Sequence, residues 1–428
     1  MKSKSILCGL LLVLTFSING QHLDLKKGNM HYNQAMRFYQ QKEYSKAAEE
    51  MKLADTFRPN HPAFVYNLAA IYSLAGNNHA ALEVLNRLVS FKLFFEVDKD
   101  SDFVSLFNDD LFRQITMQLY ENLEPIINSK FEFSINQDHL LTESVAYDSV
   151  QKIFYVGSVH KRKIVSYDSK GIQKDFIKEG QDGIWSVFGM CIDPSKRLLY
   201  ACTGVVDQTE GIDSSEIRKS GIFIYDLESG LLRDKIIFDD SVQHLLGDVT
   251  LDSKGNVYTS DSRTNVIYLL SDDGKNLTEF YKSDDFSSLQ GIAFSNDDQY
   301  LFVADYSTGI HRINTGTREK IIVKYPDNLA AIGIDGLYYY KSNLIAIQNG
   351  VKPNRVIRMM LNDNQEEIAS WEILESNNPL FNEPTLGVVN GSNFYFIANS
   401  QWEFYGKNGV ILPQVELQKP TILKLNLD

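Results

Sequence analysis

The amino-acid sequence predicts an all-β six-bladed propeller preceded by a small all-α helical-repeat domain. One observation is a unit that recurs six times after residue 142, in which two short apolar strands flank a tight polar turn. Its copies begin at Glu143, Phe188, Gly247, Gln290, Asp335 and Leu386. Four-strand units that repeat with a period of roughly 40–50 residues are typical of a propeller. The other observations are helical periodicity in residues 28–95 and an alternating run, Lys130–Ile135, directly before the first copy.

Residues 1–20 have the features of a secretory signal peptide. Lys2 and Lys4 give this segment a positive start. Ile6–Phe16 is an apolar stretch too short to span a bilayer, and Ser17–Gly20 then offers small residues for cleavage. The alternative is a buried N-terminal helix, but the polar chain that follows gives such a helix little to pack against. We therefore expect an exported protein, either periplasmic or secreted.

Residues 21–125 are predicted to form helical repeats. Ala47 and Ala54 fit the second helix of a repeat about 34 residues long, and Ala81 lies one such repeat after Ala47. Small residues at these places let paired helices approach closely. The segment resembles the tetratricopeptide family over about two units, although Gln34 stands where that family usually has leucine. The resemblance implies either a groove for a protein or peptide partner or a short helical cap packed on the propeller.

The propeller is predicted over residues 130–428. In the first five units a third and a fourth strand-like run follow the hairpin, whereas the sixth unit ends at its third run, Thr421–Leu427. A missing outer strand would leave a sheet edge with unpaired backbone groups. We predict that Lys130–Ile135 supplies this strand and so joins the two ends of the domain.

The two faces of the predicted propeller differ. Short polar turns connect the paired strands on one face, whereas the other face carries long insertions at Gly204–Ser220 and Ser400–Lys419. Long loops on a rigid scaffold are where binding sites gather. The same face receives the polar residues that open the inner strands. These are Glu143, Asp248, Gln290 and Asp335, with Glu383 close by.

Several carboxylates around one axis are costly, because like charges raise one another's pKa or recruit a cation. Oxygen ligands from carboxylates and amides suit Ca²⁺, and also Mg²⁺ or Mn²⁺. The alternative is that these residues only cap strand ends and bind water. His244 precedes Asp248 by four residues and is a candidate to reach the same place, the alternative being an exposed loop histidine. Trp402 is a candidate either to stack on a sugar-like ring or to anchor its own loop.

Charge and motif content exclude several classes of function. The net charge is -13, so a nucleic-acid surface is not expected, because phosphate binding needs a basic patch. After residue 20 no segment approaches about 18 uncharged apolar residues, so no membrane span is expected. The sequence contains no Gly-x-Ser-x-Gly, no His-Glu-x-x-His and no phosphate-binding glycine loop. Cys191 and Cys202 lie on neighbouring strands of one hairpin, where a disulfide and two independent thiols are both open.

The inner-strand openings resemble those of the gluconolactonase/regucalcin-like six-bladed propellers. The similar segments are Glu143-Ser144, Gly247-Asp248, Gln290–Ser295 and Ile334–Gly336, within residues 140–428. The resemblance implies one divalent metal held by Glu143, Gln290 and Asp335, most simply Ca²⁺, with Mg²⁺, Mn²⁺ or Zn²⁺ as alternatives. Gln290 stands where asparagine is usual and is one methylene longer, so the metal distance would have to be retuned.

The same resemblance implies hydrolysis of a small-molecule lactone or similar ester. The metal would polarise the carbonyl, and Asp335 or Asp248 would activate water. Trp402, Glu383 and His244 would contact the substrate. The competing hypothesis is a non-catalytic propeller that binds a ligand or a protein partner, because a polar substrate contact before Asp248 is lost at Gly247.

Overall fold

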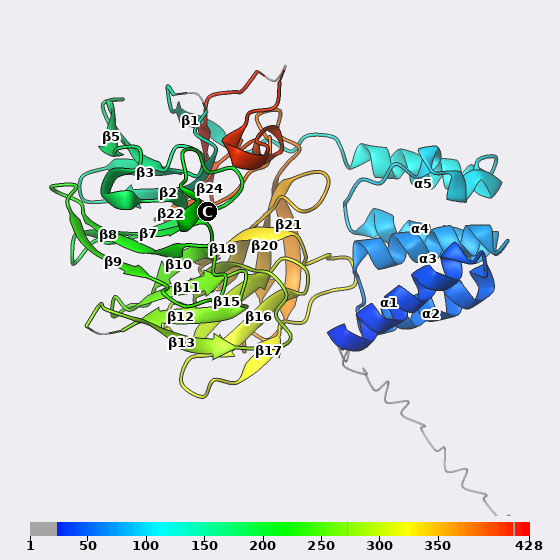
Figure 1. Ribbon diagram of the computed structural model, residues 1–428. Helices are drawn as coiled ribbons and strands as arrows, with labels where there is room; N and C mark the ends of the chain where they lie inside the picture. The colour runs from blue at the N-terminus through cyan, green and yellow to red at the C-terminus, as the bar shows by residue number, and fades with distance from the viewer. Residues whose placement is uncertain (1–23, 138, 272, 414–415) are drawn as a thin grey trace, which may run out of the picture.

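The computed structural model describes residues 24–137, 139–271, 273–413 and 416–428. Within these ranges, five α-helices precede six four-stranded sheets (Figure 1). The inner strand of each sheet packs against that of the next, and the last packs against the first, so the sheets form a ring around one axis. The predicted fold class is therefore confirmed. The predicted signal peptide, residues 1–20, lies outside the described residues.

The helical domain consists of two helix pairs followed by a fifth helix. The helices are α1 (Leu25–Gln40), α2 (Tyr44–Phe57), α3 (Pro62–Leu74), α4 (Asn78–Ser90) and α5 (Asp110–Glu121). Asp24 caps α1 by accepting the N–H of Lys27, and Pro62 starts α3, where a missing N–H costs nothing. Buried alanines, Ala47 and Ala54 among them, let the helices pack closely. In the described part of the chain, no helix combines the length and the apolar character needed to cross a membrane.

The segment between α4 and α5 folds back onto the helices. It contains the short 3₁₀ turns η1 (Val97–Lys99) and η2 (Ser101–Leu106). The hydroxyl of Tyr39 donates to Asp102 at 2.7 Å, and that of Tyr66 donates to Asp100 at 2.6 Å. The helical domain itself is confirmed, whereas its tetratricopeptide assignment stays a prediction.

Each blade is an antiparallel sheet, and in blades one to five the strands follow one another from the axis outward in chain order. Blade one contains β2 (Thr142–Asp148), β3 (Ile153–Ser158), β4 (Lys163–Asp168) and β5 (Gln173–Ile177). Blade two contains β6 (Ser186–Asp193), β7 (Leu198–Gly204), β8 (Ser220–Asp226) and β9 (Leu232–Ile237). Blade three contains β10 (Leu246–Leu251), β11 (Val257–Asp261), β12 (Val266–Leu270) and β13 (Leu277–Lys282).

Blades four and five repeat this arrangement. Blade four contains β14 (Leu289–Phe294), β15 (Tyr300–Asp305), β16 (Gly309–Asn314) and β17 (Lys320–Ile322). Blade five contains β18 (Ile334–Tyr340), β19 (Asn343–Gln348), β20 (Arg355–Leu361) and β21 (Ile368–Ser376).

Blade six is built from both ends of the propeller domain. Its strands from the axis outward are β22 (Gly387–Asn390), β23 (Asn393–Ile397), β24 (Thr421–Asn426) and β1 (Lys130–Ser134). β1 runs antiparallel to β24, with Lys130 opposite Lys424 and Ser134 opposite Thr421. The prediction that the run before the first repeat closes the ring is therefore confirmed.

One buried side chain is expected to hold the closing strand in place. Phe133 is 2% exposed, and its ring stacks on Tyr167 of blade one at a centroid distance of 4.0 Å. Phe133→Ala should lower the free energy of unfolding by about 3–5 kcal/mol, as expected when a buried aromatic site is emptied. Urea unfolding followed by near-ultraviolet circular dichroism measures this loss. Phe131 lies on the same strand and is 60% exposed, so Phe131→Ala is the matched control, and an equal loss in both variants would contradict the assignment.

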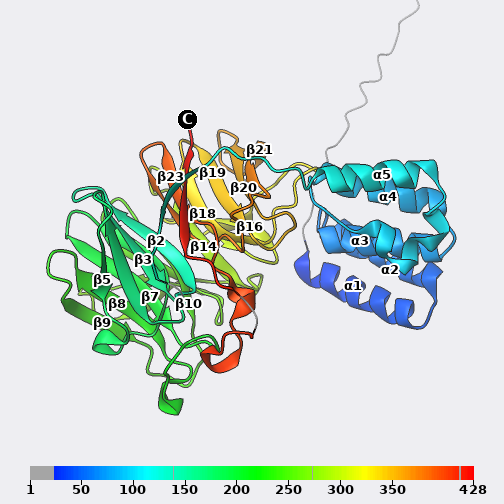
Figure 2. The ribbon, with the colours of Figure 1, turned by 90° about the horizontal axis from the view of Figure 1, so that it is seen from above.

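The helical domain docks beside blades four and five (Figures 1 and 2). Arg355 of β20 is fully buried, and its Nη1 donates to the carbonyls of Phe91 and Lys92 at 3.0 and 3.1 Å. Burial lowers the pKa of this guanidinium to about 9. Arg58, at the end of α2, donates from Nη2 to the carbonyl of Ser307 at 2.6 Å, in the loop after β15. Such loops lie where the inner strands begin, so the helices border that face of the propeller.

The two cysteines of the second blade are independent thiols. Cys191 lies on β6 and Cys202 on β7, and both are free. Cys202 Sγ lies 3.1 Å from Thr259 Oγ1, and burial raises the pKa of both thiols. The sequence left a disulfide and two independent thiols open, and the structure has the two independent thiols.

Candidate functional site

Polar residues that open the inner strands converge on a pocket at the propeller axis. The pocket has a volume of about 170 Å³. Its carboxylate and amide lining comes from four blades, namely Glu143 on β2, Asp248 on β10, Gln290 on β14 and Asp335 on β18, and Ser262 adds a hydroxyl. The structure therefore brings together all the residues predicted to bind metal or to act in catalysis. Their chemical roles stay predictions.

A β-bulge in each of these strands aims the side chain toward the axis. In blade four the register shifts between Leu289 and Ile292, around Gln290, and equivalent shifts occur in blades one, three and five. A bulge bends the strand locally and redirects a side chain. A Cβ on Gly291 would lie 2.4 Å from the backbone nitrogen of Leu337 in the next blade, so only glycine fits. A polar residue followed by glycine at this position thus places a side chain in the pocket.

Glu143 is held by the insertion of blade six. Trp402 Nε1 donates to Glu143 Oε2 at 2.8 Å. The pKa of Glu143 is raised well above its usual range, first by burial and then by repulsion from Asp335. The contact with Trp402 opposes this rise because it favours the charged carboxylate. Glu143 therefore has a fixed orientation and a strong demand for a proton or a cation.

Asp335 is held by a short hydrogen-bond chain from blades four and five. Asn349 Nδ2 donates to Asp335 Oδ2 at 2.8 Å, and the hydroxyl of Tyr306 donates to Asn349 Oδ1 at 3.2 Å. Burial raises the pKa of Asp335 to about 7. The pKa of Glu383 is also raised to about 7, by burial and by repulsion from Asp335. The axial acids therefore resist being ionised together.

Asp248 is fixed by the backbone. The N–H of Val249 donates to Oδ1 at 2.9 Å, and the N–H of Ile292 donates to Oδ2 at 3.1 Å. Burial raises the pKa of Asp248 to about 6, although these two N–H groups hold it down in part. Asp248 also lines a second cavity of about 420 Å³ that continues along the inner strands. A rigid carboxylate that is largely ionised at neutral pH is suited to accept a proton from water.

The axial donors are of the chemical type that a hard divalent cation prefers. Among the described residues, Glu143 Oε1 and Asp335 Oδ1 receive no hydrogen bond. Gln290 Nε2 donates to Ser288 Oγ at 3.2 Å, which leaves its amide oxygen for the pocket. Across the described residues, no three His, Cys, Asp or Glu side chains are grouped to hold a metal. The proposed donor set of Glu143, Gln290 and Asp335 instead has two carboxylates and one amide. All three donors are oxygens, so the set suits Ca²⁺ or Mg²⁺ better than Zn²⁺.

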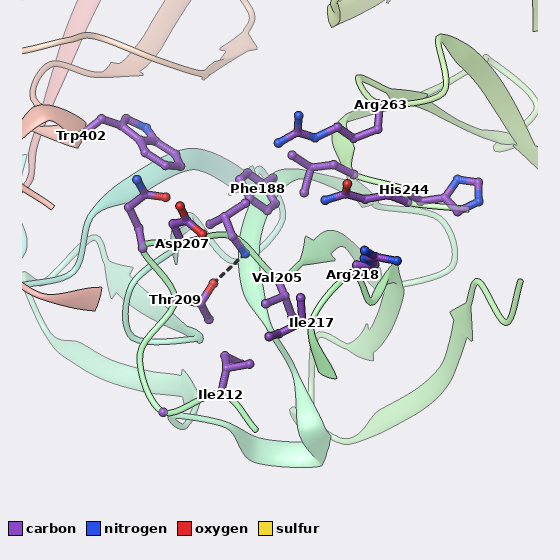
Figure 3. Close-up of a pocket in the computed structure, with 15 residues that line it drawn as sticks. Phe188, Val205, Asp207, Thr209, Ile212, Ile217, Arg218, His244, Arg263 and Trp402 are labelled. Carbon is purple, nitrogen blue, oxygen red and sulfur yellow. Dashed lines mark hydrogen bonds between the residues drawn. The ribbon is translucent and has the colours of Figure 1, made fainter. Parts of the chain in front are cut away.

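A larger cavity adjoins the axial pocket (Figure 3). This outer cavity has a volume of about 650 Å³ and lies between the blade-two insertion and the loops of blade three. Phe188, Leu245 and Trp402 line both cavities. Beside it the two long insertions meet, where the N–H of Gly409 donates to the carbonyl of Asp207 at 2.9 Å. The long loops and the axial carboxylates therefore share one face, as predicted.

The three predicted substrate contacts lie in different places. Trp402 lies between the two cavities. Glu383 is near enough to Asp335 for its pKa to be raised by that charge, but it is not part of the axial lining. His244 lines the outer cavity, and its ring points away from Trp402 (Figure 3).

His244 is held by structural contacts. It is 5% exposed, so the alternative of an exposed loop histidine is wrong. Its Nδ1 lies 2.6 Å from Asp261 Oδ2, and its ring stacks on Phe238 at a centroid distance of 3.7 Å. A role for His244 in substrate binding stays a prediction.

Sequence reasoning missed Asn349 and Tyr306. Each residue directly follows the second strand of its blade, β19 or β15. Loops that leave a second strand end on the same face as the inner-strand openings, so a polar residue at this position faces the axial site. A polar residue directly after the second strand of a blade could therefore have identified both residues from the sequence.

Comparison with known proteins supports a lactonase-type fold. No protein-family profile matches the chain. Lactonase drp35 from Staphylococcus haemolyticus is 23% identical over 308 residues, which cover 66% of this chain and 85% of that protein.

Solved structures with different activities are also similar to this chain. A gluconolactonase from Xanthomonas campestris is 11% identical over 70% of this chain and 95% of its own, with a TM-score of 0.46. An aldose sugar dehydrogenase from Streptomyces coelicolor is 14% identical over 70% of this chain and 97% of its own, with a TM-score of 0.47. These likenesses carry no argument about activity. The chain is similar in sequence to a lactonase and has a six-bladed propeller fold of lactonase type.

Proposed function

We propose that this protein is an exported, metal-dependent hydrolase that opens a lactone or a related ester at the propeller axis. The observation that carries the proposal is the meeting of Glu143, Asp248, Gln290 and Asp335 in one pocket. The similarity to Lactonase drp35 supports the reaction class. The positive and then apolar start of the chain supports export.

Glu143, Gln290 and Asp335 would hold the divalent cation. When bound, the cation supplies positive charge that offsets the carboxylates and polarises the carbonyl group of the substrate. Trp402 holds one oxygen of Glu143, and Asn349 holds one oxygen of Asp335, so each carboxylate presents its other oxygen to the pocket. This orientation is set by the fold before any ligand arrives.

Asp248 is the proposed general base. It accepts one proton from water while the water oxygen bonds to the carbonyl carbon of the lactone. The ring carbon–oxygen bond then breaks, and the proton passes to the leaving oxygen, which gives a hydroxy acid. The two backbone N–H groups on Asp248 keep its oxygens in place, and its pKa of about 6 leaves it ionised at neutral pH.

Metal analysis, melting curves and a lactone panel test the proposal. The purified protein should hold about one divalent ion per chain, as a single site of this kind requires. Added Ca²⁺ should raise the melting temperature of the wild type but not of Asp335→Ala. The metal-loaded protein should open at least one aliphatic or sugar lactone. A protein that binds no divalent ion and opens no lactone contradicts the proposal.

Export is tested separately, by N-terminal sequencing of the protein isolated from its natural source. A mature chain that starts near residue 20 supports export, whereas retention of Met1 contradicts it.

The competing hypothesis, a non-catalytic propeller that binds a ligand or a protein while the helical repeats hold a partner, is not favoured by a specific contact. The hydroxyls of Tyr39 and Tyr66, on α1 and α3, are engaged by Asp102 and Asp100 of the same chain. Such a partner therefore stays a prediction.

A further inference from the structure

Two arginines line the outer cavity without a partner. Arg218 comes from the blade-two insertion, and Arg263 comes from the loop after β11 in blade three. Both side chains are exposed, and neither guanidinium forms a hydrogen bond or an ion pair with any described residue, although the backbone N–H of Arg263 donates to Asp261 Oδ1 at 2.9 Å. Figure 3 places both on the side of the cavity opposite Trp402, and the guanidinium of Arg263 points inward.

Six arginines of the described chain form an ion pair with a carboxylate, whereas Arg218 and Arg263 do not. In blade two, Arg197 Nη2 lies 2.7 Å from Asp148 of blade one, and Arg233 Nη2 lies 2.5 Å from Asp226. Arg218 also has a φ of 79°, a backbone conformation that is unfavourable for a residue with a side chain.

We infer that the outer cavity binds an anionic group of the substrate, a carboxylate or a phosphate, carried at a distance from the ester. The inference rests on the proposed function. A guanidinium presents parallel N–H donors that match both kinds of oxyanion. Because the outer cavity and the axial pocket share Phe188, Leu245 and Trp402, one ligand can occupy both.

The charges along this path orient the ligand. When a divalent cation offsets Glu143 and Asp335, Asp248 still carries a negative charge at the axis, whereas Arg218 and Arg263 attract an anion at the far side of the outer cavity. Asp207 also lines the outer cavity, but it lies on the side of Trp402 in Figure 3. The anionic end is therefore directed outward and the uncharged ester inward. The preferred substrate class is an anionic lactone rather than a neutral one.

Lactam analogues test this inference without requiring turnover, because the ring amide resists hydrolysis. The ligands are a lactam with a carboxylate arm, its phosphate counterpart and the uncharged methyl ester of the first. Isothermal titration with Ca²⁺ present should show the wild type binding at least one anionic lactam about tenfold or more tightly than the ester. Arg218→Gln and Arg263→Gln should each lose most of this preference, and the anion whose binding depends on the arginines identifies the group.

Arg37→Gln is the matched control, because Arg37 is an exposed arginine without a partner on α1, remote from the cavity. It should keep the wild-type preference. The inference is overturned if the ester binds as tightly as both anions, if neither anion binds, or if the preference survives in both cavity variants. If anion binding depends on the arginines but no lactone is opened, the anion site is upheld and the proposed hydrolysis is contradicted. If neutral lactones are opened but no preference depends on the arginines, the hydrolysis is upheld and the anion site is contradicted.

Discussion

Asp248→Asn is expected to lower kcat for lactone opening by about 10²- to 10⁴-fold, the usual contribution of a positioned general base. Asparagine keeps the shape of the side chain but cannot take a proton from water. Both oxygens of Asp248 accept backbone N–H groups, from Val249 and Ile292, so the amide NH₂ must face one of these donors. We therefore also expect a lower melting temperature, and the kinetics should be measured well below it.

Asp252 provides the matched control. It lies at the other end of the same inner hairpin and accepts the N–H groups of Lys254 and Asn256 at 3.0 and 2.9 Å. Asp252→Asn should keep the wild-type rate. Because only the ionised base accepts a proton, kcat/KM should rise with pH through about 6 and level off above it. Near-normal activity in Asp248→Asn would contradict this role and make Asp335→Asn the next variant to measure.

Raising the pH from about 6.5 to 8.5 is expected to destabilise the metal-free protein. The pKa values of Asp335 and Glu383 are raised to about 7, and that of Glu143 is raised well above its usual range. The folded state thus holds protons that the unfolded chain, with carboxyl pKa values of about 4, has already released. The free energy of unfolding then falls as pH rises, by up to about 1.4 kcal/mol per pH unit for each proton. The thermal midpoint in a chelator, followed across this range, measures the fall.

Buried histidines set the lower limit of this pH window. Burial lowers the pKa of His61 to about 3 and that of His311 to about 4, and it also lowers the pKa of His160. These groups take up protons mainly in the unfolded chain, so below about pH 6.5 they make stability rise with pH and oppose the axial acids. Above that pH the histidines are neutral in both states.

Two changes should flatten the pH dependence above 6.5. Asp335→Asn removes one of the carboxyl groups that hold a proton in the folded state. Excess Ca²⁺ is expected to bind the axial carboxylates in their ionised form, so that they no longer hold protons. A slope that neither change alters would show that the axial carboxylates do not control it.

Local sequence patterns were sufficient to predict the ring and its axial residues. The closing strand was predictable because the sixth repeat lacks one strand and Lys130–Ser134 alternates in the way that a strand requires. The axial residues were predictable because a polar residue recurs at the inner-strand openings, and a glycine follows it in two of the four. In Gln290-Gly291 and Asp335-Gly336 both features can be read directly from the sequence.

The docking of the helical domain could not be predicted in the same way. Arg355 and Arg58 are buried against backbone carbonyls of Phe91, Lys92 and Ser307. Every residue has a backbone carbonyl, so such acceptors leave no mark in the sequence. The orientation of His244 was unpredictable for a related reason, because its direction depends on a tertiary contact with Asp261.

The closing strand also has a consequence for how the chain reaches its folded state. The hydroxyls of Ser134 and Thr421 lie 3.0 Å apart although 287 positions separate them. Contacts between such distant positions form late, because a long loop must be ordered first. During synthesis the helices and the first five blades can fold as they emerge, whereas β1 waits for β24 with its edge unpaired. A chain stalled on the ribosome or cut before Thr421 is therefore expected to expose Phe133 and a free strand edge, which chaperones recognise and which promotes aggregation.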